Sequence, residues 1–307
     1  MDLVSLILIV AGLCLFETIS SIDNAIINAE VLSTMQRWAR RWFLTWGMFI
    51  AVFLIRGALP WLIIWATIPE LGPLGALLST LSGDPAVSSA IEQSAPTLLI
   101  GGGVFLVFLF FHWLFVEEKH FGIPGERFFS RQSVWFYAVV SVVLALIVWF
   151  ALQKDAIMAF GAVVGSTAFF IVHGFRQNAE VQEARLKGGN LTDISKLFYL
   201  EVIDATFSID GVLGAFAFTL AVPLIILGNG LGALVVRELT VRNIDRIRHY
   251  IFLKHGAMYS ILILGNIMIL DSFGMHIPPW LSPIATFLIV AYFFNRSLAA
   301  RDIGSSV

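Results

Sequence analysis

Long apolar segments follow one another along the chain, and short polar stretches separate them. Isoleucine, leucine, valine and phenylalanine run in continuous blocks, without the strict apolar and polar alternation that is typical of membrane β-barrel strands. A bilayer core of about 30 Å needs roughly 20 apolar residues per helix, and blocks of this length recur along the whole sequence. The pattern therefore predicts an all-α polytopic membrane protein, with residues 1–307 forming a single transmembrane domain.

The positions of the apolar blocks predict about nine transmembrane helices. The sixth and seventh blocks meet near Pro223 with almost no polar sequence between them. The expected spans are residues 3–30, 43–67, 97–116, 134–152, 156–175, 197–221, 222–236, 256–271 and 281–295.

Composition agrees with a membrane location and excludes several other classes. The chain is 58% hydrophobic and 13% charged, with a mean hydropathy of +0.88. A net charge of −2 gives no general attraction to nucleic acid, which is not an expected partner. Cys14 is the only cysteine, so neither an intrachain disulfide nor a thiolate metal site is expected. The first segment has no basic stretch and no cleavage site, so we expect it to remain as a span.

The distribution of basic residues predicts the orientation of the chain. When the loops are numbered alternately, 17 of the 19 Lys and Arg residues fall on one side, which the positive-inside rule makes cytoplasmic. The opposite loops, 68–96 and 272–280, contain no Lys or Arg. The exceptions are Lys154, between the fourth and fifth spans, and Arg56, inside the second. We therefore expect a multi-pass protein of a bacterial inner membrane, with its N-terminus outside and its C-terminus in the cytoplasm.

Two matching acidic motifs lie inside apolar spans. The first reads Glu-Thr-Ile-Ser-Ser-Ile-Asp-Asn over residues 17–24, and the second reads Asp-Ala-Thr-Phe-Ser-Ile-Asp-Gly over residues 204–211. In the predicted topology the first span runs inward and the sixth runs outward, so the two copies are antiparallel. This is the signature of an inverted repeat, whose substrate site usually lies near mid-membrane. The predicted repeat halves are approximately 1–152 and 156–307.

Carboxylates within membrane spans need compensation. An ionised carboxylate at mid-bilayer costs roughly 2.5–3.5 kcal/mol, and Arg56 is the only cation expected within a span. Carboxylate, hydroxyl and amide oxygens suit Mn²⁺, Mg²⁺ or Ca²⁺, whereas copper(I) and closed zinc sites prefer sulfur or clustered imidazole. The alternative is that the acids only form interhelical hydrogen bonds or pair with Arg56. The expected metal ligands are Glu17, Asp23, Asn24, Glu201, Asp204 and Asp210, and the expected neighbours or pathway residues are Ser21, Ser208, Arg56 and His112.

The spacing within each motif predicts a helix break. Residues six apart on a continuous helix differ by about 240° net and lie about 9 Å apart, so Glu17 and Asp23 do not share a face. If both bind one ion, residues 18–22 must unwind or kink, and the second copy in span six is expected to break in the same way. His112 has two interpretations, an accessory ligand or a hydrogen-bonded residue at a helix end.

The motifs resemble those of a known family. Ser-Ile-Asp-Asn-Ala-Ile at 21–26, Phe-Ser-Ile-Asp-Gly-Val at 207–212, Leu-Thr-Val-Arg at 239–242 and Lys-His-Gly at 254–256 resemble the TerC-like integral membrane proteins, over nearly the whole chain. The resemblance implies a relation to the LysE-like transporters, with links to manganese export (Alx-type members), metalation of secreted enzymes and tellurium resistance. It also implies metal-handling roles for the five motif acids. Lys254 stands where an acidic residue is expected, so nothing is transferred to that loop.

These observations predict a divalent metal cation transporter, with Mn²⁺ as the expected cargo, exported by alternating access around the carboxylate cluster. Changes in carboxylate protonation would allow proton coupling. One alternative is a non-transporting scaffold or stress-response component of tellurium resistance that holds a structural metal ion. Another is an intramembrane aspartyl protease, but the sequence has no catalytic motif and we do not expect an enzyme. The sequence leaves open the identity of the ion and whether the chain forms a homodimer.

Overall fold

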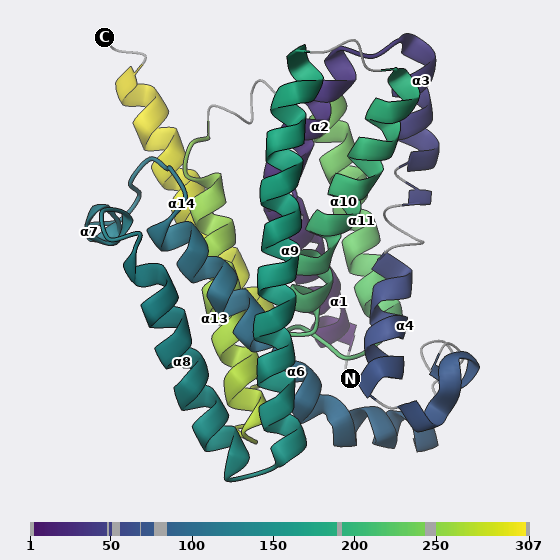
Figure 1. Cartoon of the computed structure of the whole chain (residues 1–307), viewed down its shortest axis with the longest axis vertical. Coiled ribbons are helices and arrows are strands. Elements are labelled where there is room, and N and C mark those ends of the chain that lie inside the picture. Colours follow the sequence, from purple (N-terminus) through teal and green to yellow (C-terminus); the bar gives the residue numbers. More distant parts are fainter. Residues whose placement is uncertain are drawn as a thin grey trace.

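The computed structural model describes residues 3–47, 49–50, 56–67, 69–76, 85–188, 192–242 and 250–304. Within these ranges every regular element is a helix, so the predicted all-α class is confirmed for the described part of the chain (Figure 1).

Seven helices of the described residues are long and apolar enough to cross a membrane. Each coincides with one of the predicted spans, so the chain is built as a multi-pass membrane protein. They are α1 (Leu3–Ser20), α6 (Pro85–Phe115), α8 (Trp135–Leu152), α9 (Ala156–Gly188), α11 (Val222–Arg242), α13 (Leu253–Ser272) and α14 (Leu281–Gly304).

The two other predicted spans are not among these seven helices. The span predicted at 197–221 corresponds to α10 (Asp193–Ala215), whose acidic residues make it too polar to qualify by composition alone. The span predicted at 43–67 corresponds to a π-helical turn, η1 (Phe43–Gly47), and to α4 (Arg56–Thr67), with residues between them outside the description. The count of nine therefore stays a prediction beyond the seven helices.

Close backbone contacts hold the long helices together. α9 and α13 pack along α6, and α11 and α14 pack along α1 (Figure 1). A Cβ atom placed on Gly165 of α9 would lie 2.0 Å from the carbonyl oxygen of Gly101 in α6. Small residues allow this close approach. In lipid, where no hydrophobic force drives helices together, the resulting van der Waals packing stabilises the pair.

The two ends of the bundle differ in charge. The short helix α3 (Arg37–Trp42) carries Arg37, Arg40 and Arg41 and lies at the upper end in Figure 1, where the C-terminus also lies. We call this the basic end. The N-terminus and the link between α8 and α9 lie towards the opposite end (Figure 1). The orientation of the chain in the membrane stays a prediction.

Lys154, one of the two exceptions to the predicted charge distribution, has a structural role at the opposite end. Its ammonium group donates a hydrogen bond to the carbonyl oxygen of Phe273, the residue that caps the C-terminus of α13. The same group lies 5.5 Å from the centroid of the Phe273 ring. A cation at a helix C-terminus satisfies an orphan carbonyl and complements the helix dipole, so this lysine serves packing at a bundle end.

Candidate functional site

The first acidic motif spans the junction of two helices. α1 ends at Ser20 and α2 (Ile22–Ser33) begins two residues later, with Ser21 between them at φ −91° and ψ 3°. The backbone bonds from Ser21 N to Glu17 O (3.1 Å) and from Ala25 N to Ser21 O (2.9 Å) still form. The predicted break at residues 18–22 is therefore confined to one residue, because the helical hydrogen bonds continue across it.

A stripe of buried polar side chains follows one face of α1 and α2. Glu17, Ser21, Asn24 and Asn28 are spaced by four, three and four residues, which places them on a single helical face. Their exposed fractions are 0%, 7%, 3% and 7%. The Ser21 hydroxyl donates a 2.6 Å hydrogen bond to Oε1 of Glu17. Asn28 was not predicted as a site residue, although its spacing from Asn24 would have indicated it.

The second acidic motif lies in an uninterrupted helix. α10 runs from Asp193 to Ala215 without a break, so the predicted helix break in span six is wrong. The Ser208 hydroxyl donates to the carbonyl oxygen of Asp204 at 2.7 Å, within the helix, and no unwinding is needed to satisfy it. Glu201, Asp204, Ser208 and Gly211 are spaced by three, four and three residues and share one face of α10.

The two motifs contact each other across the helix crossing. The Asn24 side-chain amide donates a hydrogen bond to Oδ1 of Asp204. Glu17 packs against Gly211, where a Cβ atom would lie 2.7 Å from Oε2 of the carboxylate. Gly232 of α11 covers the same side chain, since a Cβ atom there would lie 2.6 Å from the Glu17 Cβ. Two glycine backbones thus form the walls around this carboxylate.

These contacts are reciprocal. The first position of motif one, Glu17, meets the eighth position of motif two, Gly211. The eighth position of motif one, Asn24, meets the first position of motif two, Asp204. The two motif segments therefore cross in antiparallel directions, which is the arrangement that an inverted repeat predicts around a pseudo-two-fold axis.

Glu201 lies one turn before Asp204 and faces a different neighbour. The backbone of Gly47, the last residue of η1, approaches it so closely that a Cβ atom there would lie 2.1 Å from Oε1 of the carboxylate. Both carboxylate oxygens are buried without a hydrogen-bond partner among the described residues. A buried oxygen of this kind is costly unless a cation or a donor reaches it.

Further buried amides lie on neighbouring faces. Oδ1 of Asn24 and Oδ1 of Asn28 have no hydrogen-bond donor in the described part of the chain. Both side-chain amide atoms of Asn229 in α11, which is 1% exposed, also lack a hydrogen-bond partner among the described residues. Together with the carboxylates they provide an oxygen-rich interior, the ligand type that hard divalent cations prefer.

The remaining predicted ligands are not brought into one group. Asp210 is 7% exposed, and its six-residue spacing from Asp204 places it on another face of α10. The side chains of Asp23 in α2 and Arg56 in α4 lie outside the described residues. No group of three or more His, Cys, Asp or Glu side chains that could hold a metal ion occurs among the residues described. A shared ion therefore stays a prediction.

His112 belongs to a different cluster, at the end of α6. It is 8% exposed, its ring centroid is 3.9 Å from that of His173, and its Nδ1 is 3.7 Å from Oε1 of Glu117. Lys254 Nζ lies 2.6 Å from Oε2 of the same carboxylate. Burial alone would raise the pKa of Glu117, but the neighbouring imidazole of His112 and the charge of Lys254 together lower it to about 2.

A second buried carboxylate anchors the same loop. Glu126, in α7 (Glu126–Ser130), is 3% exposed and accepts hydrogen bonds from Gly122 N (2.6 Å) and the Tyr259 hydroxyl (2.9 Å). Nε2 of His255 lies 3.3 Å from Oε2 of this glutamate. Burial would raise the pKa of Glu126, but His255 and the Gly122 amide hold it below its ordinary value. The stretch 254–256, left without a predicted role, thus fastens the loop between α6 and α8 onto α13.

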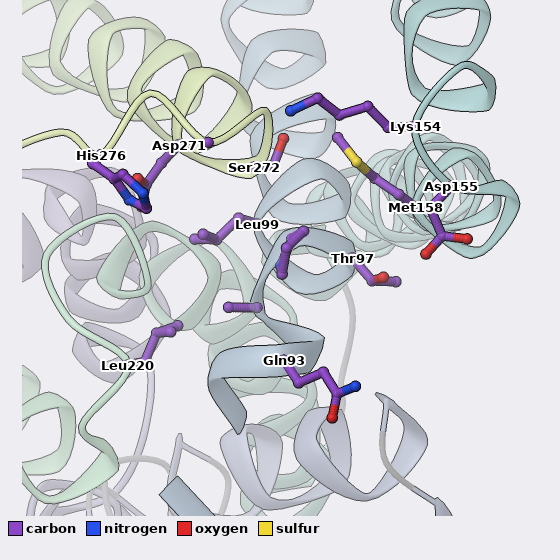
Figure 2. A pocket seen from close by; sticks show the side chains of 13 residues that line it. Gln93, Thr97, Leu99, Lys154, Asp155, Met158, Leu220, Asp271, Ser272 and His276 are labelled. Carbon is purple, nitrogen blue, oxygen red and sulfur yellow. The ribbon is translucent and has the colours of Figure 1, made fainter. Parts of the chain in front are cut away.

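A separate cavity of about 600 Å³ lies at the end opposite the basic end. Figure 2 shows Asp271 and His276 on one side of it and Lys154 and Asp155 on the other. None of its lining residues belongs to the acidic motifs. It forms a recess of mixed polar and apolar lining between the α8–α9 link, α6 and the end of α13.

Comparison with known proteins gives one family. Residues 22–302 match the model of a family described as "Protein of unknown function (DUF475)". No curated protein and no solved structure matches the chain. The matched region begins within motif one and includes the whole of motif two.

Proposed function

The chain belongs to the DUF475 family, and we propose that this protein carries divalent metal cations across a membrane, with Mn²⁺ as its cargo. The observation that carries this proposal is the reciprocal crossing of the two acidic motifs. Glu17 against Gly211, and Asn24 against Asp204, join two antiparallel segments of a multi-pass helical bundle through buried polar groups.

The energetics of burial favour a cation at this crossing. Glu17 is fully buried and Asp204 is partly buried, and an ionised carboxylate deep in a bilayer is costly without positive charge. The hydrogen bonds from Ser21 and Asn24 offset part of the cost of removing two carboxylates from water. A divalent ion at the crossing offsets negative charge there, and the surrounding oxygen atoms match the ligand preference of Mn²⁺.

The packing around the crossing supports alternating access. On the side away from the basic end, Leu13 and Phe16 belong to the large apolar cluster, with Phe16 and Phe218 ring centroids 5.8 Å apart. On the other side is a smaller cluster, here called the basic-end cluster. Its members are Val31, Leu32, Met35, Ala39, Phe43, Leu197 and Leu200. Apolar packing on both sides of a buried polar crossing suits a site that opens to one face at a time.

The resemblance to TerC-like proteins supports manganese as the cargo and export as the direction. With the basic end in the cytoplasm, ions enter from that end and leave towards the 600 Å³ cavity. Protonation of the motif carboxylates during the return step provides a route for proton antiport. A scaffold that holds a structural ion would share the binding but not the flux.

Mn²⁺ flux in proteoliposomes tests the proposal. We expect the wild-type protein to move Mn²⁺, and we expect Asp204→Asn and Glu17→Gln to lose at least about 90% of the rate, because each removes a charge that the ion needs. Glu118→Gln is the matched control, since Glu118 is an exposed carboxylate in the α6–α8 loop. Mn²⁺ binding without flux in the wild-type protein would favour the scaffold, and unchanged flux in both variants would refute the carboxylate site.

A further inference from the structure

The polar stripe of α1 and α2 continues beyond the motif crossing, towards the basic end. Asn28 lies one helical turn after Asn24 on the same face, about 16 Å along the axis from Glu17. Because Asn24 meets Asp204 and the two helices run antiparallel, Asn28 lies level with the preceding turn of α10, which contains Glu201. The stripe therefore has a second level of polar groups, which the duplicated motif does not include.

This second level presents oxygen atoms without donors. Asn28 is 7% exposed, and its Oδ1 has no hydrogen-bond partner among the described residues. The two carboxylate oxygens of Glu201 are also buried without a hydrogen-bond partner among the described residues. An amide oxygen and a carboxylate at one level form a partial shell for a hard cation, and neither oxygen is consumed by protein donors.

A π-helical turn covers Glu201. η1 (Phe43–Gly47) places the Gly47 backbone directly on Oε1 of Glu201 and the Phe43 side chain in the basic-end cluster. π-helical turns are rare and often occur at functional sites. η1 lies between the polar stripe and the basic end, and it covers Glu201.

The corner next to η1 is tied to the start of α10. The ammonium group of Lys196 donates to Thr34 Oγ1 at 3.0 Å and to Thr34 O at 3.3 Å. The backbone amide of Gln36 donates to Oδ2 of Asp193 at 3.3 Å. These bonds hold the α2–α3 corner on α10, so movement of η1 can uncover Glu201 without separating the two helices.

We propose that Glu201 and Asn28 form an entry site for a divalent cation on the basic-end side of the motif crossing, gated by the turn Phe43–Gly47. This inference rests on the proposed transport function and names the first binding position on its path. A hydrated ion exchanges some of its waters for these two side chains and then moves one turn inward, to Asn24 and Asp204. The entry site has fewer charges than the crossing and binds the ion more weakly.

The kinetics of Mn²⁺ flux test the entry site. We expect Glu201→Gln to raise the Mn²⁺ concentration for half-maximal flux by about tenfold while the maximal rate changes less, because the central site is intact. Glu201→Asp keeps the charge and is expected to recover most of the loss. Asn28→Ala should shift the half-maximal concentration in the same direction, and Glu118→Gln should not shift it.

The gate is tested by a pair of glycine substitutions. Gly47→Ala places a methyl group 2.1 Å from Oε1 of Glu201, so η1 cannot close on the carboxylate in its present position. Gly57→Ala is the control, since a Cβ atom there has nothing within 4 Å. We expect Gly47→Ala to alter the half-maximal Mn²⁺ concentration and Gly57→Ala to leave it unchanged.

The outcomes separate the entry site from the transport function. Wild-type kinetics in Glu201→Gln and Asn28→Ala, with flux lost in Asp204→Asn, would overturn the entry site and leave the transporter standing. Loss of all equilibrium Mn²⁺ binding in Glu201→Gln would also overturn it, since Glu201 would then belong to the central site. Absence of Mn²⁺ flux and binding in the wild-type protein would refute the transport function itself.

Discussion

At the scale of single residues, the contacts of the site depend on glycines as much as on acids. Gly211 and Gly232 lie against Glu17, and Gly47 lies against Glu201. The duplicated pattern singled out Glu17, Asn24 and Asp204, which lie at the crossing of the two helices, and their role in binding an ion stays a prediction. Asn28 could have been found from its four-residue spacing from Asn24. Gly47 could not, because its role depends on which helices approach each other in space.

Gly211→Ala tests the close approach of α10 to Glu17. At an open helical position this change stabilises a helix by about 0.5–1 kcal/mol, but here the new methyl group would lie 2.7 Å from Oε2 of Glu17. We expect a net destabilisation of about 1–3 kcal/mol, seen as a lower melting temperature in detergent. Gly57→Ala should show the opposite sign, and equal melting temperatures for the two variants would contradict this packing.

At the scale of helices, hydrophobicity was sufficient to predict the seven apolar helices and their approximate bounds. The predicted break in α10 was wrong for a physical reason. Unwinding is required only if both acids of one copy bind the same ion, whereas the contacts observed join the first position of one copy to the last of the other. Spacing within a single helix contains no information about this pairing across copies.

The loop between α6 and α8 was also beyond prediction, because its anchors come from distant parts of the chain. Glu126 gains its donors from Gly122 and from Tyr259 of α13. The bond between Tyr259 and Glu126 joins residues 133 positions apart, and an apolar span with a single tyrosine does not indicate it.

Tyr259→Phe tests this anchor. The change removes one hydrogen bond to a buried carboxylate, which is worth about 1.5–3 kcal/mol, so the loop should open more often. We expect faster trypsin cleavage at Lys119, Arg127 and Arg131, measured on the purified protein. Tyr292→Phe is the control, since its exposed hydroxyl accepts a hydrogen bond from Arg296, one turn along the same helix. Equal cleavage rates in the two variants would contradict the anchor.

At the scale of the whole molecule, the two motifs belong to distant parts of the sequence and meet inside one bundle. α1, α2 and α10 supply the crossing, α11 covers it, and apolar clusters lie on either side. Figure 1 places α3, with its three arginines, at the end opposite the link between α8 and α9. The reciprocal contacts between the motifs could not be predicted from the sequence, because they depend on the depth of each helix relative to the other.

Mn²⁺ binding to the purified protein, followed by the electron paramagnetic resonance signal of the free ion, tests the central claim most directly. If the two motifs share one ion, the wild-type protein should bind one tight Mn²⁺ per chain, and Glu17→Gln and Asp204→Asn should each remove that same ion. Two tight ions per chain, with each substitution removing only one of them, would contradict a shared site between the two acidic motifs.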